Sequence, residues 1–422
     1  MDKSRYRPRL VDKRLDFYLS TFPAVAVEGP KWCGKTWTST MHAQSVFMLA
    51  DPLNNFSNRE IARLDVNKAL EGAEPHLVDE WQEVPAIWDA VRYKSDERTD
   101  KGRFILTGSS TPRLKGVLHS GTGRIASLPM HPMSLQESGD SACTVSIQDV
   151  CDGKDIGVVT VPTPTVERLI ELVLRGGWPG SIGLPLDQAM GIAHEYVENI
   201  VKIDIHRLDG IDRDSVKVRK CLRSLARNES TTASTATIRD DIAEVDDTSM
   251  GIHTVAAYLD AFKRMFLTND VVPFSPFLRS PQRIKQMPKH RFCDPSIAAA
   301  LLEASPGSLM RDMRTFGFLF ESLACRDLEI YAESLGAKLY HYQDYGGAEI
   351  DAVLQFSDGT WSGFEIKLNP ADVDEAAARL CSIASRFVHN PPRSLAVVVG
   401  VHGIAHRRPD GVYVLPLTSL KD

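Results

Sequence analysis

Short apolar runs alternate with amphipathic stretches along the first third of the chain. The apolar runs have the length and composition of buried strands, and they cover residues 24–27, 46–51, 75–78, 103–110 and 125–128. Between them, 10–19 and 60–70 carry apolar residues at the three- and four-residue spacing of amphipathic helices. Strands that alternate with helices predict an α/β domain.

The middle of the chain has helical spacing almost throughout. Apolar faces recur over 166–174, 189–205, 218–227, 238–242 and 254–266. The last of these stretches is followed by apolar residues to Val272 and then by a Pro-containing segment that ends near Arg291. Helices followed by a small hairpin of this kind predict a winged helix.

The end of the chain returns to an α/β pattern. A helix is expected over 317–330, and two alternating stretches flank the Asp358-Gly359 pair, which is a hairpin signal. A further helix at 371–387 and a strand at 394–399 complete the pattern. We therefore expect three domains, over 1–165, 166–310 and 311–422. The polar segment 138–165 looks like an insert, and its sequence indicates no role.

Composition and charge narrow the function classes. A chain of 422 residues is longer than a single hydrophobic core ordinarily supports, so more than one domain is expected. A net charge of −6 argues against a protein that wraps nucleic acid over its whole surface. The seven cysteines are scattered without a Cys-x-x-Cys pair, which indicates neither a zinc site nor a disulfide framework. Because no signal peptide or membrane-length apolar run is present in the sequence, we expect a cytoplasmic protein without a membrane partner.

The first apolar run leads directly into a phosphate-loop pattern. It has the form Gly-x-x-x-x-Gly-Lys-Thr and comprises Gly29, Pro30, Lys31, Trp32, Cys33, Gly34, Lys35 and Thr36. The glycines allow successive backbone N–H groups to face phosphate oxygens, Lys35 can reach the β- and γ-phosphates, and the Thr36 hydroxyl can ligate Mg²⁺. The alternative is an ordinary glycine turn, which the preceding strand makes much weaker. The motif predicts nucleoside triphosphate binding.

An acidic pair follows the third apolar run. Asp79 at the strand tip can hold Mg²⁺, and Glu80 beside it can polarise an attacking water. Such a pair also occurs as a solvated turn. Behind a phosphate loop, however, it predicts hydrolysis of the bound nucleotide.

Two further features complete the expected nucleotide site. Thr107 and Ser109 end a strand, and ligands of α/β sheets bind at strand ends, so either residue can sense the γ-phosphate or position water. The alternative is that they form a polar cap at the end of the strand. Arg124 lies in a glycine-rich stretch and is a candidate arginine finger, in cis or from a neighbouring subunit of a homo-oligomer. Arg113 is a second candidate for the same role. For Arg113 and Arg124 alike, an ordinary solvated arginine is at least as good an interpretation.

Together these motifs resemble a family of prokaryotic AAA-type ATPases that carry a C-terminal domain of unknown function. The resemblance extends in order over nearly the whole chain and rests on residues 29–36, 79–85, 106–110, 123–124, 132–135, 137 and 175–180. It implies an ATPase in the N-terminal part, with ATP and Mg²⁺ as ligands, and a winged-helix-like segment after it. The 138–165 segment departs from the family pattern.

A basic stretch lies in the expected hairpin. It places five cations in an otherwise acidic chain, namely Arg279, Arg283, Lys285, Lys289 and Arg291. Phosphates of DNA or RNA are bound by such groups. A solvated basic loop, or one that docks on the nucleotide domain, is an equally good interpretation.

The C-terminal pattern contains a second chemical constellation. Asp351 lies on one strand of the hairpin, and Glu365 and Lys367 share one face of the next. Two carboxylates can hold Mg²⁺ or Mn²⁺ and a lysine can stabilise an attacking hydroxide, while Glu321 from the preceding helix adds a carboxylate. The order resembles restriction-endonuclease-like (PD-D/ExK) nucleases. Alternatively, Glu-x-Lys can be a pair of charged residues on the exposed face of an antiparallel hairpin. Even a nuclease-like fold would not by itself imply cleavage.

The sequence thus predicts a Mg²⁺-dependent ATP-hydrolysing protein whose nuclease-like C-terminal domain binds or cleaves nucleic acid. The alternative is a slow ATPase switch or scaffold for protein partners, with an inactive nuclease-like domain. A metabolite kinase is disfavoured, because no acceptor pocket is evident in the sequence.

Overall fold

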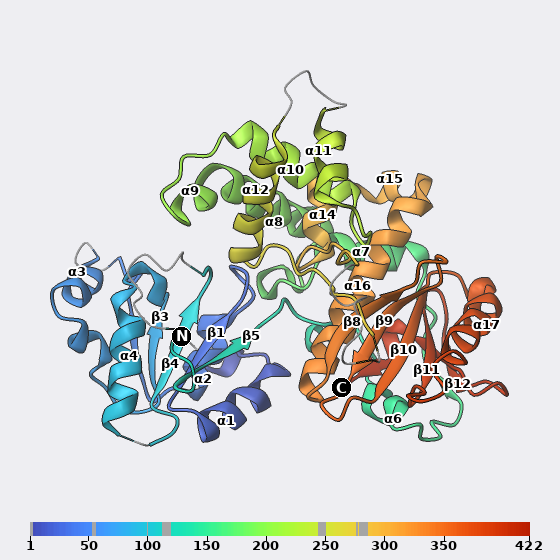
Figure 1. Cartoon of the computed structure of the whole chain (residues 1–422), viewed down its shortest axis with the longest axis horizontal. Coiled ribbons are helices and arrows are strands. Elements are labelled where there is room, and N and C mark those ends of the chain that lie inside the picture. The colour runs from blue at the N-terminus through green and yellow to red at the C-terminus, as the bar shows by residue number, and fades with distance from the viewer. Residues whose placement is uncertain are drawn as a thin grey trace. The chain divides into compact units, whose positions relative to one another are not determined.

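The computed structural model describes residues 3–52, 56–98, 100–111, 120–243, 250–275, 277 and 286–422. The chain divides into two compact units, coloured by residue number in Figure 1. The first unit comprises Met1–Pro132, Ile203–Asp212 and Ala261–Leu267, and the second comprises Met133–Lys202, Arg213–Asp260 and Thr268–Asp422. Among the described helices, none has the length and apolarity that crossing a membrane would require.

The first unit is built on a five-stranded parallel sheet in the order β2-β3-β4-β1-β5. Its strands are β1 (Ala24–Glu28), β2 (Ser45–Met48), β3 (His76–Asp79), β4 (Phe104–Gly108) and β5 (Ile125–Pro129). Its helices are η1 (Lys3–Arg5), α1 (Val11–Thr21), α2 (Lys35–His42), α3 (Ser57–Leu64), η2 (Val66–Leu70), η3 (Trp81–Glu83) and α4 (Ala86–Glu97). The predicted α/β fold of this region is confirmed.

Strand β1 lies between β4 and β5, and both of its faces are buried, which explains its continuous apolar run. Ala24 and Ala26 pack in the core that includes Ile87 of α4, while Val25 packs with Leu15 of α1 in a second core. Side chains alternate between the faces of a strand, so each face has its own helical cover. The phosphate-loop segment therefore leaves the sheet at a rigid, fully packed strand.

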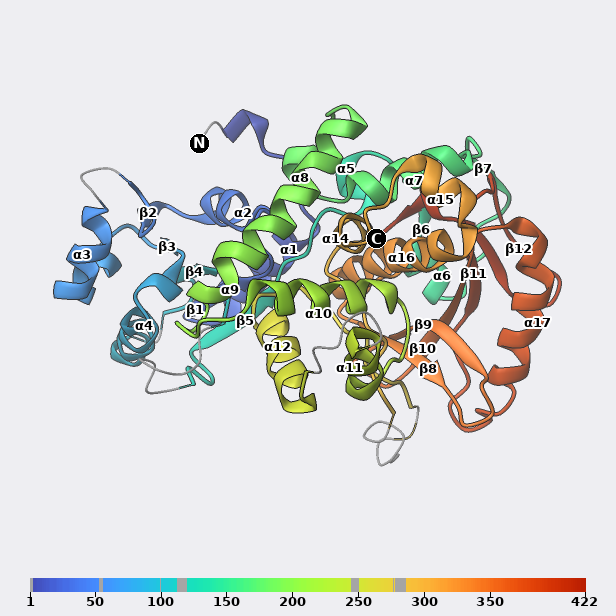
Figure 2. The same ribbon diagram turned by 90° about the horizontal axis from the view of Figure 1, so that it is seen from above.

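The second unit begins with a short segment and a group of helices. Its elements up to residue 311 are α5 (Leu135–Ser138), β6 (Val145–Ser146), α6 (Ile147–Cys151), β7 (Val159–Thr160), α7 (Val166–Arg175), η4 (Pro179–Ser181), α8 (Leu186–Asn199), α10 (Ser215–Arg227), α11 (Thr235–Ala243), α14 (Pro295–Leu301) and α15 (Pro306–Arg311). The π-helical η5 (Ile200–Asp204) and α12 (Ile252–Arg264) pass between the units along the chain, and α9 (Ile205–Arg207) lies in the first. Within the second unit, α14 packs against α7, α8 and α10 (Figure 2).

Three isolated antiparallel bridges lie in the region expected to form a winged helix; Thr231 precedes α11, and the other five residues follow α12. They join Thr231 to His290, Thr268 to Phe292, and Val271 to Lys289, all antiparallel. The helices agree with the apolar spacing, and the bridges lie where the sequence predicts a hairpin. The winged-helix assignment itself stays a prediction.

The C-terminal part of the second unit contains a seven-stranded mixed sheet in the order β7-β12-β13-β11-β10-β9-β8. Its elements are α16 (Met313–Ser334), β8 (Lys338–Gln343), β9 (Glu349–Gln355), β10 (Trp361–Lys367), η6 (Pro370–Asp372), α17 (Val373–Ala384), β11 (Leu395–Val399), β12 (Ile404–Arg407), β13 (Tyr413–Pro416), η7 (Leu417–Ser419) and β14 (Leu420–Lys421). Strands β8, β9 and β10 form an antiparallel meander, and β11 is parallel to β10. Helix α17 connects these last two strands along the chain.

The polar segment 138–165 contributes one strand to this sheet and one to a separate pair. Strand β7 pairs with β12 at the edge of the seven-stranded sheet, where Thr160 lies opposite Ile404, and β6 pairs with β14 in a two-stranded sheet, where Val145 lies opposite Leu420. The segment therefore groups with the second unit, whereas the sequence pattern places it in the first domain. The three-domain division stays a prediction.

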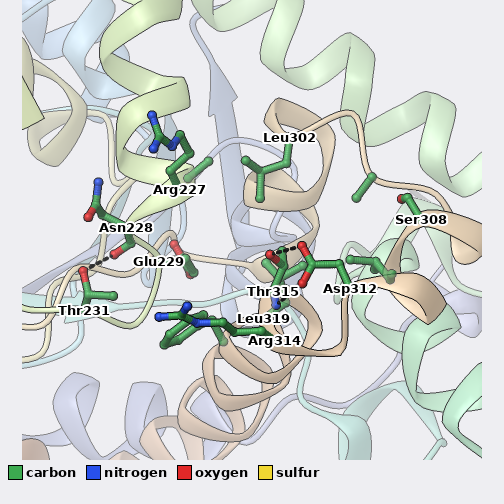
Figure 3. Close-up of a pocket in the computed structure, with 14 residues that line it drawn as sticks. Arg227, Asn228, Glu229, Thr231, Leu302, Ser308, Asp312, Arg314, Thr315 and Leu319 are labelled. Atoms are coloured by element: carbon green, nitrogen blue, oxygen red, sulfur yellow. Dashed lines mark hydrogen bonds between the residues drawn. The ribbon is translucent and has the colours of Figure 1, made fainter. Parts of the chain in front are cut away.

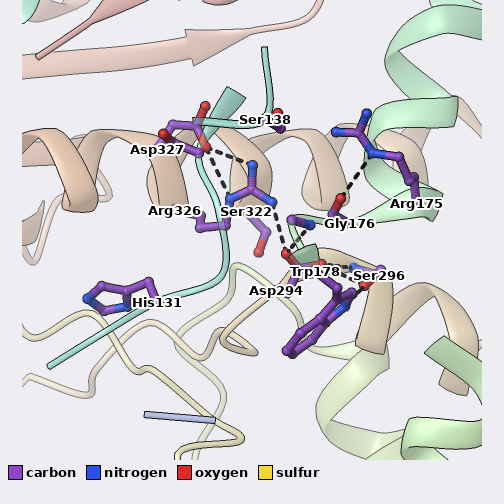
Figure 4. Close-up of polar contacts among 12 residues, drawn as sticks. His131, Ser138, Arg175, Gly176, Trp178, Asp294, Ser296, Ser322, Arg326 and Asp327 are labelled. Atoms are coloured by element: carbon purple, nitrogen blue, oxygen red, sulfur yellow. Dashed lines mark hydrogen bonds and ion pairs between the residues drawn. The ribbon is translucent and has the colours of Figure 1, made fainter. Parts of the chain in front are cut away.

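A buried ionic network fixes the glycine-rich turn after α7 (Figure 4). Arg326 donates to Asp294 from Nη1 over 2.8 Å and to Asp327 from Nη2 over 2.8 Å. Asp294 also accepts from the backbone N–H of Gly177 over 2.9 Å, and a Cβ at Gly177 would lie 2.2 Å from the Met133 carbonyl oxygen. The turn thus requires glycine because backbone and guanidinium approach it closely.

Candidate functional site

The phosphate-loop segment joins β1 to α2, as its sequence predicts. Gly34 has φ of 105°, a left-handed conformation that favours glycine. A Cβ at Gly29 would lie 2.1 Å from the carbonyl oxygen of Met130, so only glycine fits there. Both glycines of the motif are therefore required by backbone geometry, and α2 begins directly at Lys35.

Lys35 is buried beneath the loop. Its Nζ donates to the carbonyl oxygens of Gly29 over 2.9 Å and Pro30 over 2.8 Å. Only 5% of the residue is exposed, so the ammonium is held within the loop. This placement fits the phosphate-binding role predicted for Lys35.

An arginine that the sequence patterns did not single out supports the same loop. Arg9, which precedes α1, is 6% exposed, and its guanidinium donates to the Cys33 carbonyl oxygen over 2.7 Å and to the His131 carbonyl oxygen over 2.8 Å. The residue lies in a basic segment whose cations have no distinctive spacing. Nothing in that segment distinguishes Arg9 from its neighbours until the chain is folded.

The Asp79 carboxylate lies between two threonine hydroxyls. Its Oδ1 accepts from the Thr36 hydroxyl over 2.8 Å and from the Thr107 hydroxyl over 2.6 Å. Burial raises the pKa of Asp79, and the two hydrogen bonds oppose that rise. The structure thus brings together three of the predicted residues from α2, β3 and β4, and a hydroxyl and a carboxylate are the oxygen ligands that Mg²⁺ prefers.

Glu80 is oriented by a second set of contacts. Its backbone N–H donates to the Thr107 hydroxyl over 3.0 Å, and its Oε2 accepts from the Ser109 hydroxyl over 2.9 Å. Gln82, which the sequence reasoning missed, also donates to Glu80 and contacts Ser109 over 3.2 Å. Glu80 has φ of 58°, an uncommon conformation for a non-glycine residue that is associated with functional sites.

Two other loop residues lie toward solvent. The Lys31 ammonium contacts the Asp204 carboxylate over 2.6 Å, and 44% of the Lys31 side chain is exposed. Trp32 has φ of 67° and is 62% exposed. Neither side chain is packed as a core residue, so both are available at the loop surface.

Arg124 lies at the opposite end of the strands from the phosphate loop. Its carbonyl oxygen accepts from the Ala24 N–H at the start of β1, whereas the loop follows the end of β1. At ~3.3 Å per strand residue, about 20 Å separates them. Its guanidinium pairs with Asp96 over 2.8 Å. The predicted cis arginine finger is therefore wrong for Arg124; a role toward a neighbouring subunit stays a prediction, and Arg113 lies outside the described residues.

The predicted C-terminal residues also come together. Lys367 Nζ donates to Glu365 Oε1 over 3.0 Å and lies 3.7 Å from Asp351 Oδ2. Asp351 accepts from the Ile366 N–H over 2.8 Å, and Arg379 of α17 donates to Glu365 over 2.7 Å. Asp351 is 7% and Glu365 2% exposed, so the expectation of an exposed hairpin face does not hold for them.

A fourth element enters this cluster through Lys289. Its Nζ lies 2.9 Å from Glu321 Oε1, 2.5 Å from Glu349 Oε1 and 3.7 Å from Asp351 Oδ1. Burial raises the pKa of Glu321 to about 8 and that of Glu365 to about 7, while the Lys289 charge opposes the rise at Glu321. Burial lowers the pKa of Lys289, but the charges of the three carboxylates outweigh that effect and leave its pKa raised well above the ordinary value. The carboxylate cluster thus contains an internal cation.

This placement corrects the predicted nucleic-acid stretch. Lys289 is 4% exposed, and Arg291 is 3% exposed and paired with Glu329. Neither can contact nucleic-acid phosphates in this conformation, because both are buried in ion pairs. Arg279, Arg283 and Lys285 lie outside the described residues.

A cavity of about 580 Å³ lies elsewhere in the second unit, and none of the predicted site residues lines it (Figure 3). Its wall includes Arg227 at the end of α10, Arg314 in the first turn of α16, and the neighbouring Asp312. Asp312 caps α16 by accepting from the Thr315 N–H over 3.1 Å. The cation-lined wall therefore also carries a carboxylate, and the lining suggests no single ligand class.

Three family models match successive parts of the chain. Residues 21–139 match an AAA domain, 166–308 match a domain of unknown function (DUF8612), and 316–420 match a domain of unknown function (DUF4143). The predicted AAA-type P-loop ATPase domain, followed by a C-terminal domain of unknown function, is confirmed.

Individual proteins are also similar to this chain. Uncharacterized proteins of Mycobacterium bovis and Mycobacterium tuberculosis are each 24% identical over 361 residues, which cover 84% of this chain and 72% of theirs. The Walker-type ATPase PABY2304 of Pyrococcus abyssi has a TM-score of 0.43 and 15% identity, with 71% of this chain and 97% of that chain covered.

Proposed function

We propose that this chain, whose residues 21–139 form an AAA-type P-loop domain, hydrolyses ATP in a Mg²⁺-dependent reaction. The observation that carries the proposal is the Thr107 hydroxyl, which donates to Asp79 and accepts from the Glu80 N–H. One side chain thereby fixes the residue suited to metal binding and the residue suited to water activation. A domain that only bound nucleotide would not need Glu80 to be positioned.

Each residue has a distinct part in this proposal. Lys35 and the loop N–H groups bind the β- and γ-phosphates, and Thr36 with Asp79 holds Mg²⁺ directly or through its water shell. Bound Mg²⁺ would neutralise charge that develops on the phosphate oxygens. Glu80, held by Ser109 and Gln82, accepts a proton from the attacking water or orients it.

The test compares ATP hydrolysis and ATP binding in matched variants. Lys35→Ala is expected to lose binding, whereas Glu80→Gln is expected to bind ATP and to hydrolyse it at least tenfold more slowly. Glu83→Gln is the control, because Glu83 is a nearby, partly exposed carboxylate whose pairing with Arg59 over 3.5 Å has no link to Asp79. Unchanged hydrolysis in both Lys35→Ala and Glu80→Gln would refute the proposal.

For the C-terminal domain we propose a restriction-endonuclease-like fold that binds or cleaves nucleic acid. Helix α16, the β8-β9-β10 meander, helix α17 and the parallel strand β11 supply the element order expected for this fold. Asp351, Glu365 and Lys367 converge on adjacent strands, which supports a phosphodiester site. A competing proposal, favoured by the cation already buried beside Asp351, is a slow ATPase switch whose nuclease-like domain is inactive.

A plasmid-nicking assay with Mg²⁺ or Mn²⁺, with and without ATP, separates these two proposals. Cleavage that is lost in Lys367→Ala but kept in Lys338→Ala would support the nuclease, because Lys338 is an exposed lysine on β8 of the same sheet. Absent cleavage, or equal cleavage in wild type and Lys367→Ala, would remove the nuclease proposal and leave the switch.

A further inference from the structure

Lys289 reaches the carboxylate cluster from outside the sheet and its helices. It lies in the segment expected to form a hairpin, and its backbone pairs with Val271 in an isolated bridge. The side chain is nevertheless 5% exposed, and its ammonium lies within 4 Å of carboxylates from α16 and β9. Burying a lysine is costly unless opposite charges surround it, so the cluster and this lysine form one electrostatic unit.

The two other cations nearby make their shortest contacts with Glu365, although Lys367 also lies 3.7 Å from Asp351 Oδ2. Lys367 and Arg379 both contact Glu365 Oε1, whereas Glu365 Oε2 is buried without a hydrogen-bond partner among the described atoms. Within the described part of the chain, Lys289 is the cation found within 4.0 Å of Glu321 and Glu349. Removal of Lys289 would therefore leave Glu321 and Glu349 without this counterion, while Asp351 would keep Lys367 at 3.7 Å.

The spacing of these oxygens suits an ammonium ion rather than a bound metal. They lie 2.5, 2.9 and 3.7 Å from Nζ, whereas Mg²⁺ requires oxygen ligands at about 2.0–2.1 Å. These carboxylates could move together around Mg²⁺ only if the Lys289 ammonium left the space between them. Beside this cluster, on the strand that pairs with β9, Glu365 Oε2 is a further buried carboxylate oxygen without a hydrogen-bond partner among the described atoms.

We propose that Lys289 is the resident cation of the Glu321, Glu349 and Asp351 cluster and excludes Mg²⁺ or Mn²⁺ from it. A divalent ion then binds to these carboxylates only when the Lys289 side chain withdraws. The segment that carries Lys289 thus controls whether the C-terminal site holds a metal. The inference rests on the proposed nuclease-like function only for the choice of a divalent ion as the competing ligand.

The test measures Mn²⁺ binding to the full chain in the absence of nucleotide, by electron paramagnetic resonance of the free ion. Lys289→Met is expected to bind one Mn²⁺ at least about tenfold more tightly than wild type. Adding Asp351→Asn to Lys289→Met should abolish the gain, and Lys338→Met, which removes an exposed lysine from the same sheet, should show none. Equal Mn²⁺ affinity in wild type and Lys289→Met would overturn the proposal.

Thermal unfolding provides a second readout in case the variant folds poorly. Because Lys289→Met leaves carboxylates without their counterion, its midpoint should fall, and Mn²⁺ should raise that midpoint far more than it raises the wild-type midpoint. A destabilised Lys289→Met protein that saturating Mn²⁺ neither binds nor restabilises would contradict the proposal.

Comparison with the nicking assay separates the two ideas. Mn²⁺ binding by Lys289→Met without any plasmid cleavage would sustain the role of Lys289 while the nuclease proposal fails. Cleavage by Lys289→Met that exceeds wild-type cleavage would support both. Cleavage by wild type with no change in Mn²⁺ binding in Lys289→Met would support the nuclease and refute the role of Lys289.

Discussion

Thr107→Val provides the sharpest test of how the nucleotide site is organised. Valine has nearly the same shape as threonine but cannot donate to Asp79 or accept from the Glu80 N–H. Thr107 is fully buried, so water is poorly placed to replace the hydroxyl. The substitution therefore removes the one side-chain link between the metal-binding and water-activating positions, while β4 keeps its packing volume.

The expected magnitude follows from the kind of hydrogen bond that is lost. A hydrogen bond to a charged group contributes about 1.5–3 kcal/mol. If that contribution is made fully in the transition state, kcat for ATP hydrolysis falls about 10- to 150-fold, at about 1.36 kcal/mol per tenfold change. ATP affinity should change little, because Lys35 bonds to the carbonyl oxygens of Gly29 and Pro30, whereas the Thr107 hydroxyl bonds to Asp79 and Glu80.

The assay combines steady-state ATP hydrolysis with a direct measurement of ATP binding. Thr38→Val is the matched control: Thr38 is likewise fully buried, but its hydroxyl lies 3.0 Å from the Tyr6 hydroxyl rather than in the acidic site. Thr38→Val should reduce stability by about 1 kcal/mol and leave kcat within twofold. A Thr107→Val protein with wild-type kcat would show that Asp79 and Glu80 need no common anchor.

Three further outcomes are expected. Gly29→Ala should abolish ATP binding, measured by titration, because its Cβ would lie 2.1 Å from the Met130 carbonyl oxygen; retained affinity would mean that the loop can shift at little cost. Asp294→Ala should lower the free energy of unfolding, measured in urea, by about 3–5 kcal/mol, because Arg326 loses a buried partner. The control Asp312→Ala, which removes an exposed helix cap, should lower it by about 1 kcal/mol. Equal losses in the two variants would contradict this reasoning. A hydrogen bond from the His42 ring to the Asp12 carboxylate, together with other contacts, raises the pKa of His42 above its ordinary 6.5. Its contribution to stability should therefore be complete below pH 6.5 and lost as the pH rises through the higher folded-state pKa. His42→Asn should flatten this pH dependence in urea unfolding, and an unchanged pH profile would count against the assignment.

Local sequence predicted most residues of the proposed nucleotide site, because these residues follow strand ends at fixed offsets. Parallel strands place their carboxyl ends on one edge, so Thr36, Asp79 and Thr107 had to meet there once the strands were identified. Gln82 was missed because its role depends on the turn that Glu80 makes with φ of 58°. The cis interpretation of Arg124 failed for a related reason: a glycine-rich sequence shows that a loop is present but not at which end of the sheet it lies.

The C-terminal cluster shows a different limit. The strand spacing placed Glu365 and Lys367 on one face and Asp351 on the neighbouring strand, since side-chain alternation is a local property of strands. It could not show that these residues are buried, nor that Glu349 joins them. Lys289 was interpreted as part of an exposed basic stretch, because a lysine in a polar segment has the same local pattern whether it faces solvent or three carboxylates.

The sequence by itself determined the phosphate loop, the order of strands and helices, and the pairs of residues whose spacing is fixed by backbone geometry. Only the tertiary structure decided which charges are neutralised and by which partners. Backbone periodicity acts over a few residues and is encoded locally, whereas the burial of an ion depends on every chain segment that excludes water from it. The ammonium of Lys289, 32 residues from Glu321 in sequence and 2.9 Å from it in space, depends on that second kind of information.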